Sequence, residues 1–322
     1  MTLLLTRSDL ESVLDPADAV DALRDGFRAR SPDGSVAGQR VRTDLPFPGT
    51  ATALIPGLLP GIEAYTVKVN AKFPDARPAL RGIICLHSGH DGELLALLDS
   101  ATVTAWRTGL AAALGTHVLA GEGSVLGVVG AGAQAELTVR GLGVLRGHGE
   151  LVVHDTDGER AAEFVERHGE GRNRGRGRGR GRGRVVASAS EVASLADTVV
   201  LATWSREPLL DLADTRAGQH FTSLGADEPG KRELGLALLR EALVVVDDRE
   251  LAATMGALAV GGVTADATLG EVLRGEHPGR TGKDSRTVYA PVGLPWQDLA
   301  LAWTAYERAR REGVGRRVDL LA

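Results

Sequence analysis

Apolar positions follow two different periodicities in the first 120 residues, and each periodicity predicts its own elements. The pair Asp15-Pro16 supplies a capping side chain and a proline at the first helical position, and apolar residues then recur at helical spacing. Between about 38 and 100, short apolar runs are separated by prolines and glycines, which predicts strands. Alternation in one run places Lys68 on the face opposite its two valine neighbours. An alanine-rich helix carrying Arg107 is expected over 102–119.

From residue 124 onward, short apolar runs alternate with segments of helix length. Strands followed by helices predict a doubly wound α/β fold, in which helices cover both faces of a parallel sheet. We expect this domain over 119–296 and a smaller α+β domain over 1–118, to which 297–322 return. The expected strands are 125–129, 151–154, 185–187, 198–202, 220–224, 243–247 and 289–292, and a closing helix is expected over 296–312.

The first of these strands runs directly into a glycine-rich turn. Gly130 allows the tight turn, Gly132 lets the backbone approach a pyrophosphate at a helix N-terminus, and Ala135 permits close packing. Asp155 follows the next strand, where a carboxylate would accept hydrogen bonds from both ribose hydroxyls. The combination predicts a Rossmann dinucleotide site, and the acid favours NAD over NADP. The alternative is a structural turn with a helix-capping aspartate. The predicted cofactor-binding residues of this site are Gly130, Ala131, Gly132, Ala133, Gln134 and Asp155.

The composition limits the class of protein. With 43% hydrophobic and 25% charged residues in 322, the chain is long enough for two packed domains and is not broadly disordered. Cys85 is the only cysteine, which excludes a disulfide framework and a thiolate metal cluster, and the histidines lack ligand spacing, so no metal is expected. No run approaches the roughly 20 apolar residues of a membrane span. We therefore expect a soluble, cytoplasmic protein.

Charge is distributed unevenly along the chain. The net charge is −5, but 172–184 contain seven arginines and no acid, and removing those seven charges leaves −12. An acidic body argues against a nucleic acid as the main partner. The tract itself is read as a solvated, disordered surface loop; an RNA-binding arm is the alternative, which the lack of stacking aromatics disfavours.

Four parts of the chain together resemble the ornithine cyclodeaminase/mu-crystallin family. They are Lys68 and the segments 99–109, 130–135 and 225–234, and the similarity extends over nearly the whole chain apart from the arginine tract. The resemblance implies a Rossmann domain joined to a smaller domain that binds the substrate and forms a homodimer, with the active site in the cleft between the two domains.

The family acts on amino and imino acids, whose carboxylate a buried site must pair with cations. The resemblance implies that Arg42, Lys68 and Arg107 bind this carboxylate. Arg42 is equally well read as a surface cation, and Lys72 competes with Lys68 for its role.

A catalytic acid is expected just beyond the strand predicted at 220–224. Asp227 lies there, at the carboxyl end of a parallel strand, where ligands bind in such sheets. The resemblance implies that Asp227 acts as acid and base together with Lys68; a loop-capping aspartate is the alternative. The other residues implied for the site are Lys231, Val292 and Gly293 at the substrate, the last two beside the nicotinamide, and Thr108 at the cofactor.

The expected reaction is hydride transfer between Cα and NAD, with water converting the imine to a 2-oxo acid and ammonia, or imine reduction in reverse. The family's cyclodeaminases carry a glutamate where this chain has Ala53, so a dehydrogenase or imine reductase is favoured over a cyclodeaminase. A non-enzymatic nucleotide-binding protein is the third alternative, which Asp227 and Lys231 disfavour. Arg81 either extends the anion site towards a diacid or points into solvent. Residues 255–258 also depart from the family pattern, so the substrate's identity stays open.

Overall fold

The polypeptide leaves its first folding unit at Arg107 and returns to it at Leu294. The computed structural model describes residues 1–29, 41–47, 50–73, 76, 80–169, 182–226, 228, 230–259 and 261–320. One unit comprises Met1–Arg107 and Leu294–Ala322, and the other comprises Thr108–Gly293. No described helix is long and apolar enough to cross a membrane.

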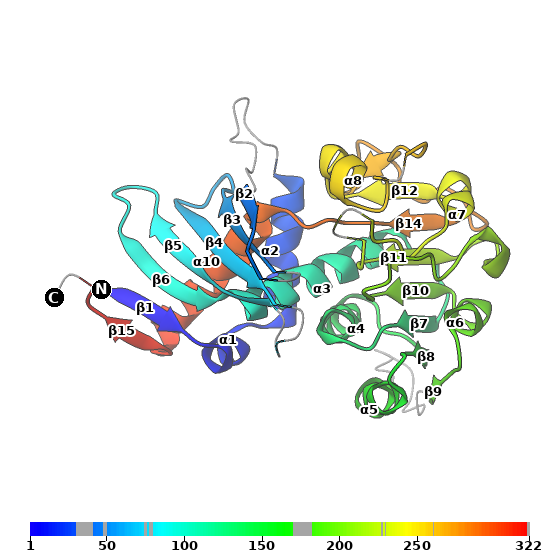
Figure 1. Ribbon diagram of the computed structural model, residues 1–322, viewed down its shortest axis with the longest axis horizontal. Helices are drawn as coiled ribbons and strands as arrows, with labels where there is room; N and C mark the ends of the chain where they lie inside the picture. Colours follow the sequence, from blue (N-terminus) through cyan, green and yellow to red (C-terminus); the bar gives the residue numbers. More distant parts are fainter. Residues whose placement is uncertain are drawn as a thin grey trace. The chain divides into compact units, whose positions relative to one another are not determined.

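The first unit is built on a mixed seven-stranded sheet in the order β15-β1-β6-β5-β4-β3-β2. Its strands are β1 (Thr2–Leu5), β2 (Val41–Asp44), β3 (Ala51–Gly57), β4 (Ala64–Lys72), β5 (Leu80–Ser88), β6 (Leu94–Asp99) and β15 (Arg316–Val318). Its helices are α1 (Arg7–Val13), α2 (Pro16–Arg28) and α10 (Pro295–Glu312), and α10 packs on β3, β4, β5 and α2 (Figure 1). The α+β prediction is confirmed, but the short strands β1 and β15 were not predicted.

Helix α2 begins as its sequence predicts. Asp15 accepts hydrogen bonds from the backbone N–H groups of Ala17 and Asp18, and Pro16 occupies the first position. Its apolar face packs on α10, where the rings of Phe27 and Trp296 meet edge to face with centroids 4.9 Å apart. These contacts fix the first turn of α10 against α2.

The register of the sheet separates its two faces. Lys68 lies opposite Ile55 on β3 and Ile84 on β5, and the three side chains are 2%, 6% and 0% exposed. This is the face that α10 covers. On the opposite face, Leu54 and Ile83 are 45% and 44% exposed. Lys68 is therefore buried on a covered, apolar face, opposite its valine neighbours as predicted.

The second unit contains an eight-stranded, all-parallel sheet in the order β13-β12-β14-β11-β10-β7-β8-β9. The strands are β7 (Val125–Val129), β8 (Glu150–His154), β9 (Arg182–Val185), β10 (Thr198–Leu201), β11 (His220–Ser223), β12 (Leu243–Val246), β13 (Ala267–Thr268) and β14 (Thr287–Tyr289). The helices are α3 (Ser100–Leu119), which enters from the first unit, α4 (Ala133–Leu145), α5 (Gly158–His168), α6 (Ala189–Leu195), α7 (Leu236–Glu241), α8 (Arg249–Met255) and α9 (Leu269–Leu273).

Two separate apolar clusters cover the faces of this sheet. Residues of α3, α4 and α5 form one cluster, and residues of α6, α7 and α8 form the other. The doubly wound fold is confirmed. One strand was misplaced, because the run expected over 289–292 ends at Tyr289.

The arginine tract was predicted to be a loop over 172–184, and this is wrong for its last three residues. Residues 182–184 belong to the edge strand β9, which pairs in parallel with β8. Arg184 forms an ion pair with Glu150 on β8 at 3.0 Å. Charged side chains are well tolerated on an edge strand, which explains why the alternating Arg-Gly pattern ends in one. Residues 172–181 lie outside the described part of the chain.

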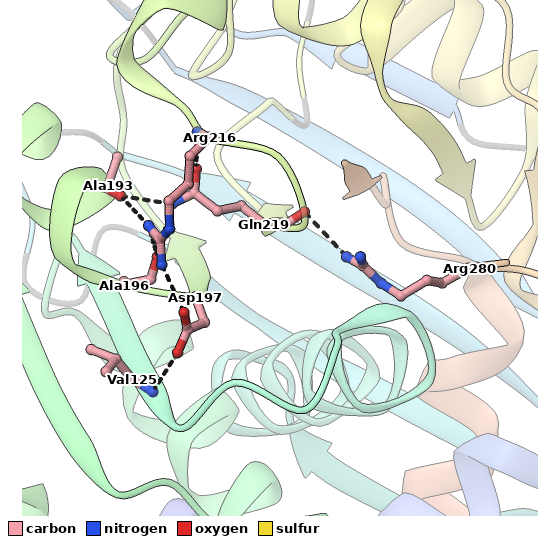
Figure 2. A network of polar contacts seen from close by, with 7 residues as sticks. All are labelled: Val125, Ala193, Ala196, Asp197, Arg216, Gln219 and Arg280. Carbon is pink, nitrogen blue, oxygen red and sulfur yellow. Dashed lines mark hydrogen bonds and ion pairs between the residues drawn. The ribbon is translucent and has the colours of Figure 1, made fainter. Parts of the chain in front are cut away.

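A polar network ties helix α6 to the sheet in the second unit (Figure 2). Arg216 donates to the carbonyl oxygens of Ala193 and Ala196, at 3.2 and 2.8 Å, and forms an ion pair with Asp197 at 2.7 Å. Asp197 also accepts a hydrogen bond from the backbone N–H of Val125 at 3.1 Å. These contacts lie at the amino ends of β7 and β10, whereas the glycine turn follows the carboxyl end of β7. We therefore assign the network a structural role.

Candidate functional site

The glycine turn after β7 has the geometry of an anion site. Gly130 has a φ of +90°, and a Cβ atom there would lie 2.6 Å from the carbonyl oxygen of Ala202. Gly132 is the N-cap of α4 and supplies no side-chain cap, and a Cβ atom on Gly132 would meet nothing within 4 Å. The first N–H groups of this 13-residue helix therefore face open space, which suits a pyrophosphate.

Asp155 is held beside this turn at the carboxyl end of β8. Its carboxylate accepts hydrogen bonds from the N–H groups of Ala131 at 2.7 Å and Asp157 at 2.9 Å. The Arg160 guanidinium binds both oxygens, at 3.1 and 2.6 Å. Burial alone raises the pKa of Asp155, but the hydrogen bonds from Arg160 and the two backbone groups outweigh it and lower the pKa to about 2. The acid is therefore ionised beside the glycine turn, with a cation attached to it.

The pairing of Asp155 with Arg160 predicts how cofactor selectivity changes on mutation. We expect Asp155→Ala to weaken NADH binding about tenfold, because charge-assisted hydrogen bonds to the ribose are lost. NADPH should bind more tightly to this variant than to the wild type, since Arg160 would meet the 2′-phosphate without an opposing carboxylate. Titration of both nucleotides gives the two dissociation constants. The control is Asp157→Asn, which changes the acid that caps α5; an unaltered NADH-to-NADPH ratio in Asp155→Ala would refute the assignment.

A second cluster lies in the first unit, where β4, α3 and α10 meet around one carboxylate. Lys68 Nζ lies 2.5 Å from Asp298 Oδ2, and Arg107 Nε lies 3.5 Å from Asp298 Oδ1. Arg107 Nη1 also donates to Gln297 Oε1 at 3.3 Å. The side chains of Lys68 and Asp298 are each 2% exposed, and that of Arg107 is 9% exposed. Two cations thus lie beside one carboxylate in a buried site.

Several polar atoms in this cluster have no hydrogen-bond partner among the described residues. They are Arg107 Nε, Gln297 Nε2, Asp298 Oδ1 and Thr66 Oγ1. Buried polar groups are normally satisfied, so donors without a partner among the described residues, beside two buried cations, favour the binding of an anionic ligand. A carboxylate meets both requirements.

The remaining predicted cations lie elsewhere on the sheet. Arg42 on β2 lies opposite Ala53 on β3, which in turn lies opposite Asn70 on β4, so Arg42 belongs to the sheet face that carries Lys68. Its side chain is half-exposed and forms an ion pair with Asp44 at 3.3 Å. Arg81 is exposed on the face opposite Lys68, which favours the alternative that it points into solvent. The side chain of Lys72 lies outside the described residues.

The loops after β10 and β11 are joined by a buried carboxylate that the sequence analysis did not single out. Glu233 accepts hydrogen bonds from the N–H and hydroxyl of Thr203, both at 2.7 Å, and from Ser223 Oγ and the Gly225 N–H, both at 2.8 Å. Burial raises its pKa, which these hydrogen bonds partly offset. Asp227, two residues beyond Gly225, lies outside the described residues, so the structure describes only the support beside it.

Lys231 and the segment 292–293 have partners of their own in the second unit. Lys231 Nζ lies 3.7 Å from Glu228 Oε2 and 5.1 Å from the ring centroid of Trp204. The N–H groups of Val292 and Gly293 donate to the buried carboxylate of Asp247, at 3.0 and 2.6 Å. Asp247 thus fixes the backbone that was predicted to pass the nicotinamide.

The close packing of Gly109 shows where the preceding residue of α3, Thr108, lies. A Cβ atom on Gly109 would lie 2.5 Å from Leu137 Cβ and 2.9 Å from the carbonyl oxygen of Gln134, so α3 crosses closely over the start of α4. Thr108 is half-buried at this crossing, next to the glycine turn. No cluster of three or more potential metal ligands occurs among the described residues.

Comparison with known proteins gives one family over nearly the whole chain. The model of the ornithine cyclodeaminase/mu-crystallin family matches residues 1–313. An alanine dehydrogenase of Archaeoglobus fulgidus is 31% identical, over 98% of each chain. The structure of an archaeal alanine dehydrogenase dimer with bound NAD superposes with a TM-score of 0.87 at 30% identity, over 99% of each chain. A Thermococcus litoralis Delta(1)-pyrroline-2-carboxylate reductase, in complex with NADH and L-proline, gives a TM-score of 0.87 at 27% identity, over 98% of this chain and 100% of that one. The chain therefore belongs to the ornithine cyclodeaminase/mu-crystallin family.

Proposed function

We propose that this protein is an NAD-dependent oxidoreductase acting on the CH–NH₂ or C=N bond of an amino acid or a cyclic imino acid. The observation that carries the proposal is the buried pair of cations, Lys68 and Arg107, which share the single carboxylate of Asp298. A pair of buried cations suits the carboxylate of such a substrate. The glycine turn and Asp155 supply the matching nucleotide site, and the relatives that bind NAD or NADH support the cofactor.

The chain's own residues divide the work between holding the substrate and moving protons. Lys68 and Arg107 bind the carboxylate and thereby orient Cα and its nitrogen. Asp227 takes a proton from the substrate amine and releases it to solvent, so that it is again a carboxylate when the imine has formed. It then takes a proton from the water that attacks the imine carbon and passes it to the nitrogen that departs as ammonia. When bound, NAD would supply the hydride acceptor for Cα, or the hydride donor in reverse. The backbone at 292–293, held by Asp247, would border the nicotinamide.

One residue on the sheet face that carries Lys68 supports a dehydrogenase or imine reductase over a cyclodeaminase. Ala53, at the position of the cyclodeaminase glutamate, lies opposite Asn70 on the face that carries Lys68. A methyl group there provides no counter-ion for the distal ammonium of ornithine or lysine. A cyclodeaminase that recycles NAD and releases ammonia is the second candidate, since the family includes such enzymes.

Oxidation of NADH and of NADPH, followed optically, distinguishes these activities. We expect NADH oxidation with a cyclic imino acid, or with a 2-oxo acid and ammonia or methylamine. Conversion of ornithine to proline without net NADH consumption would instead establish a cyclodeaminase. Saturable NADH binding without turnover of any of these compounds would indicate a non-enzymatic binding protein.

We also propose that the protein forms a homodimer through the uncovered face of the seven-stranded sheet. Leu4, Val41, Leu54 and Ile83 share this face by register and are 37% to 54% exposed, a large apolar area for one sheet face. A second copy would bury the same residues on both sides of a two-fold axis. The related archaeal alanine dehydrogenase is a dimer, which supports this assignment.

Charge placed on this face should dissociate the dimer. We expect the wild-type chain of 33.7 kDa to have twice that mass in solution, and Leu54→Glu with Ile83→Glu to have the mass of one chain. Light scattering after size-exclusion chromatography gives both masses. Leu58→Glu is the control, because Leu58 is 51% exposed but follows β3 outside the sheet. A double variant that keeps the wild-type mass would exclude this face as the interface.

A further inference from the structure

Helix α10 carries one acid on its buried face. Asp298 shares that face with Leu301, Ala302 and Ala305, and all four residues are at most 2% exposed. A carboxylate at such a position costs free energy unless cations and donors satisfy it. Among the described residues, the cations that pair with Asp298 are those that the proposed function assigns to substrate binding, which indicates that its role concerns that site.

The carboxylate of Asp298 connects the two cations directly. One oxygen, Oδ2, lies 2.5 Å from Lys68 Nζ, and the other, Oδ1, lies 3.5 Å from Arg107 Nε. Lys68 comes from β4 and Arg107 from α3, so no backbone element holds their head groups at a fixed separation. Asp298 is the side chain that does so.

Gln297 extends this arrangement to the backbone of the helix. Its Oε1 accepts from Arg107 Nη1 and from the N–H of Leu294, both at 3.3 Å. The Gln297 amide therefore links the Arg107 guanidinium to Leu294, the N-cap residue of α10. Gln297 Nε2 has no partner among the described residues, so a donor beside Arg107 remains for a bound anion.

The first turn of α10 is itself fixed by close packing. A Cβ atom on Gly57 would lie 2.5 Å from the carbonyl oxygen of Pro295, and one on Gly26 would overlap the ring of Trp296. Only glycine fits at both places, so the turn packs tightly on β3 and α2. Asp298 therefore projects from a rigid platform, as accurate placement of binding groups requires.

We propose that Asp298 is a positioning residue of the substrate site, which holds Lys68 and Arg107 at the separation that binds one carboxylate and lowers the positive charge of the site by one. This rests on the proposed function and specifies how its substrate anchor is held. Without the Asp298 carboxylate, the anchor would carry one more positive charge and would bind small anions more tightly.

The test separates charge from position with two substitutions. Asp298→Asn keeps the shape and removes the charge. We expect kcat to fall about 100-fold, as misplacement by about 1 Å produces. Inhibition by propionate, a carboxylate without an amine, should tighten at least about tenfold because the anchor gains a net charge. Asp298→Glu keeps the charge but displaces it, so kcat should fall without tighter propionate inhibition. This variant retains a counter-ion for both cations, so it tests the proposal even if Asp298→Asn does not fold.

Glu307→Gln is the matched control, an identical chemical change on the exposed side of α10, and should leave kcat unchanged. NADH affinity, measured by fluorescence, should be the same in all four proteins, which shows that the nucleotide unit is intact. Wild-type kcat and propionate inhibition in both Asp298 variants would overturn the proposal. Failure of the wild-type protein to turn over any amino or imino acid would instead refute the proposed function. In that case, the affinity for propionate of the wild type compared with that of Asp298→Asn would still test the anchor.

Discussion

Asp227→Ala should lower kcat at least about 1,000-fold, because a general acid–base group contributes about 100- to 10,000-fold and here serves both the amine and the attacking water. The carboxylate belongs to a loop that follows β11, at the edge of the sheet where ligands bind in this fold. The nucleotide site uses the glycine turn and Asp155, which are unaffected by the change. The dissociation constant of NADH should therefore stay within a few-fold of wild type.

Single-turnover kinetics and NADH titration measure these two quantities separately. Glu228→Gln is the control, since it removes a neighbouring carboxylate that lies 3.7 Å from Lys231 Nζ. The control should retain most of the wild-type rate. If Asp227→Ala kept most of its rate, the acid–base assignment would be wrong, and a parallel loss of NADH binding would point to a collapsed loop instead.

Lys68→Met should lower kcat/KM by about the same factor as Asp227→Ala lowers kcat. Removing one partner of a buried charge pair at a binding site costs about 2–5 kcal/mol, so we expect kcat/KM for the carboxylate substrate to fall about 1,000-fold. The site loses one of the two cations that bind the carboxylate, while Arg107 stays beside Asp298. NADH binding should be unchanged. The variant should also unfold more easily, since Asp298 Oδ2 loses the ammonium 2.5 Å away.

The control for Lys68→Met is Arg81→Met, which removes a cation from the opposite face of the same sheet. We expect this variant to keep kcat/KM within about twofold, as is usual for an exposed position. Circular dichroism confirms that both variants are folded at the assay temperature. Equal losses in the two variants would mean that long-range charge, rather than the buried anchor, explains the effect.

The nucleotide site could be predicted from the sequence because its determinants are local. Gly130, Gly132 and Ala135 lie within one turn, and Asp155 follows the adjacent strand, so strand periodicity and spacing fix their relation. The pairing of Asp155 with Arg160 was not predicted. The approach of Arg160 to the carboxylate depends on the start of α5, which Asp157 caps.

The anchor could be predicted only in part, because its members are far apart in the chain. Lys68 and Arg107 were implied by resemblance, but Asp298 follows Lys68 by 230 residues and was missed. Sequence alone does not show which buried face meets which strand. One signal was available, since Asp298 is a single acid at helical spacing with Leu301, Ala302 and Ala305 on an apolar face. Such a residue marks either a buried ion pair or a site.

The strands β1 and β15 were missed for a related reason. Each has four residues or fewer, and they pair with each other from opposite ends of the chain. Strands this short carry little periodicity, so long-range pairing rather than local pattern defines them. The same applies to 182–184, where a repetitive Arg-Gly sequence enters the sheet through pairing with β8.

Transfer of deuterium from NADH labelled at C4 of the nicotinamide tests the central claim most directly. The protein is incubated with the labelled cofactor and the best imino acid or 2-oxo acid with amine, and the product is analysed by mass spectrometry and NMR. The account predicts one deuterium at Cα of the amino acid product for each NADH oxidised. Product without deuterium at Cα, or NADH oxidation without an amino acid product, would contradict it.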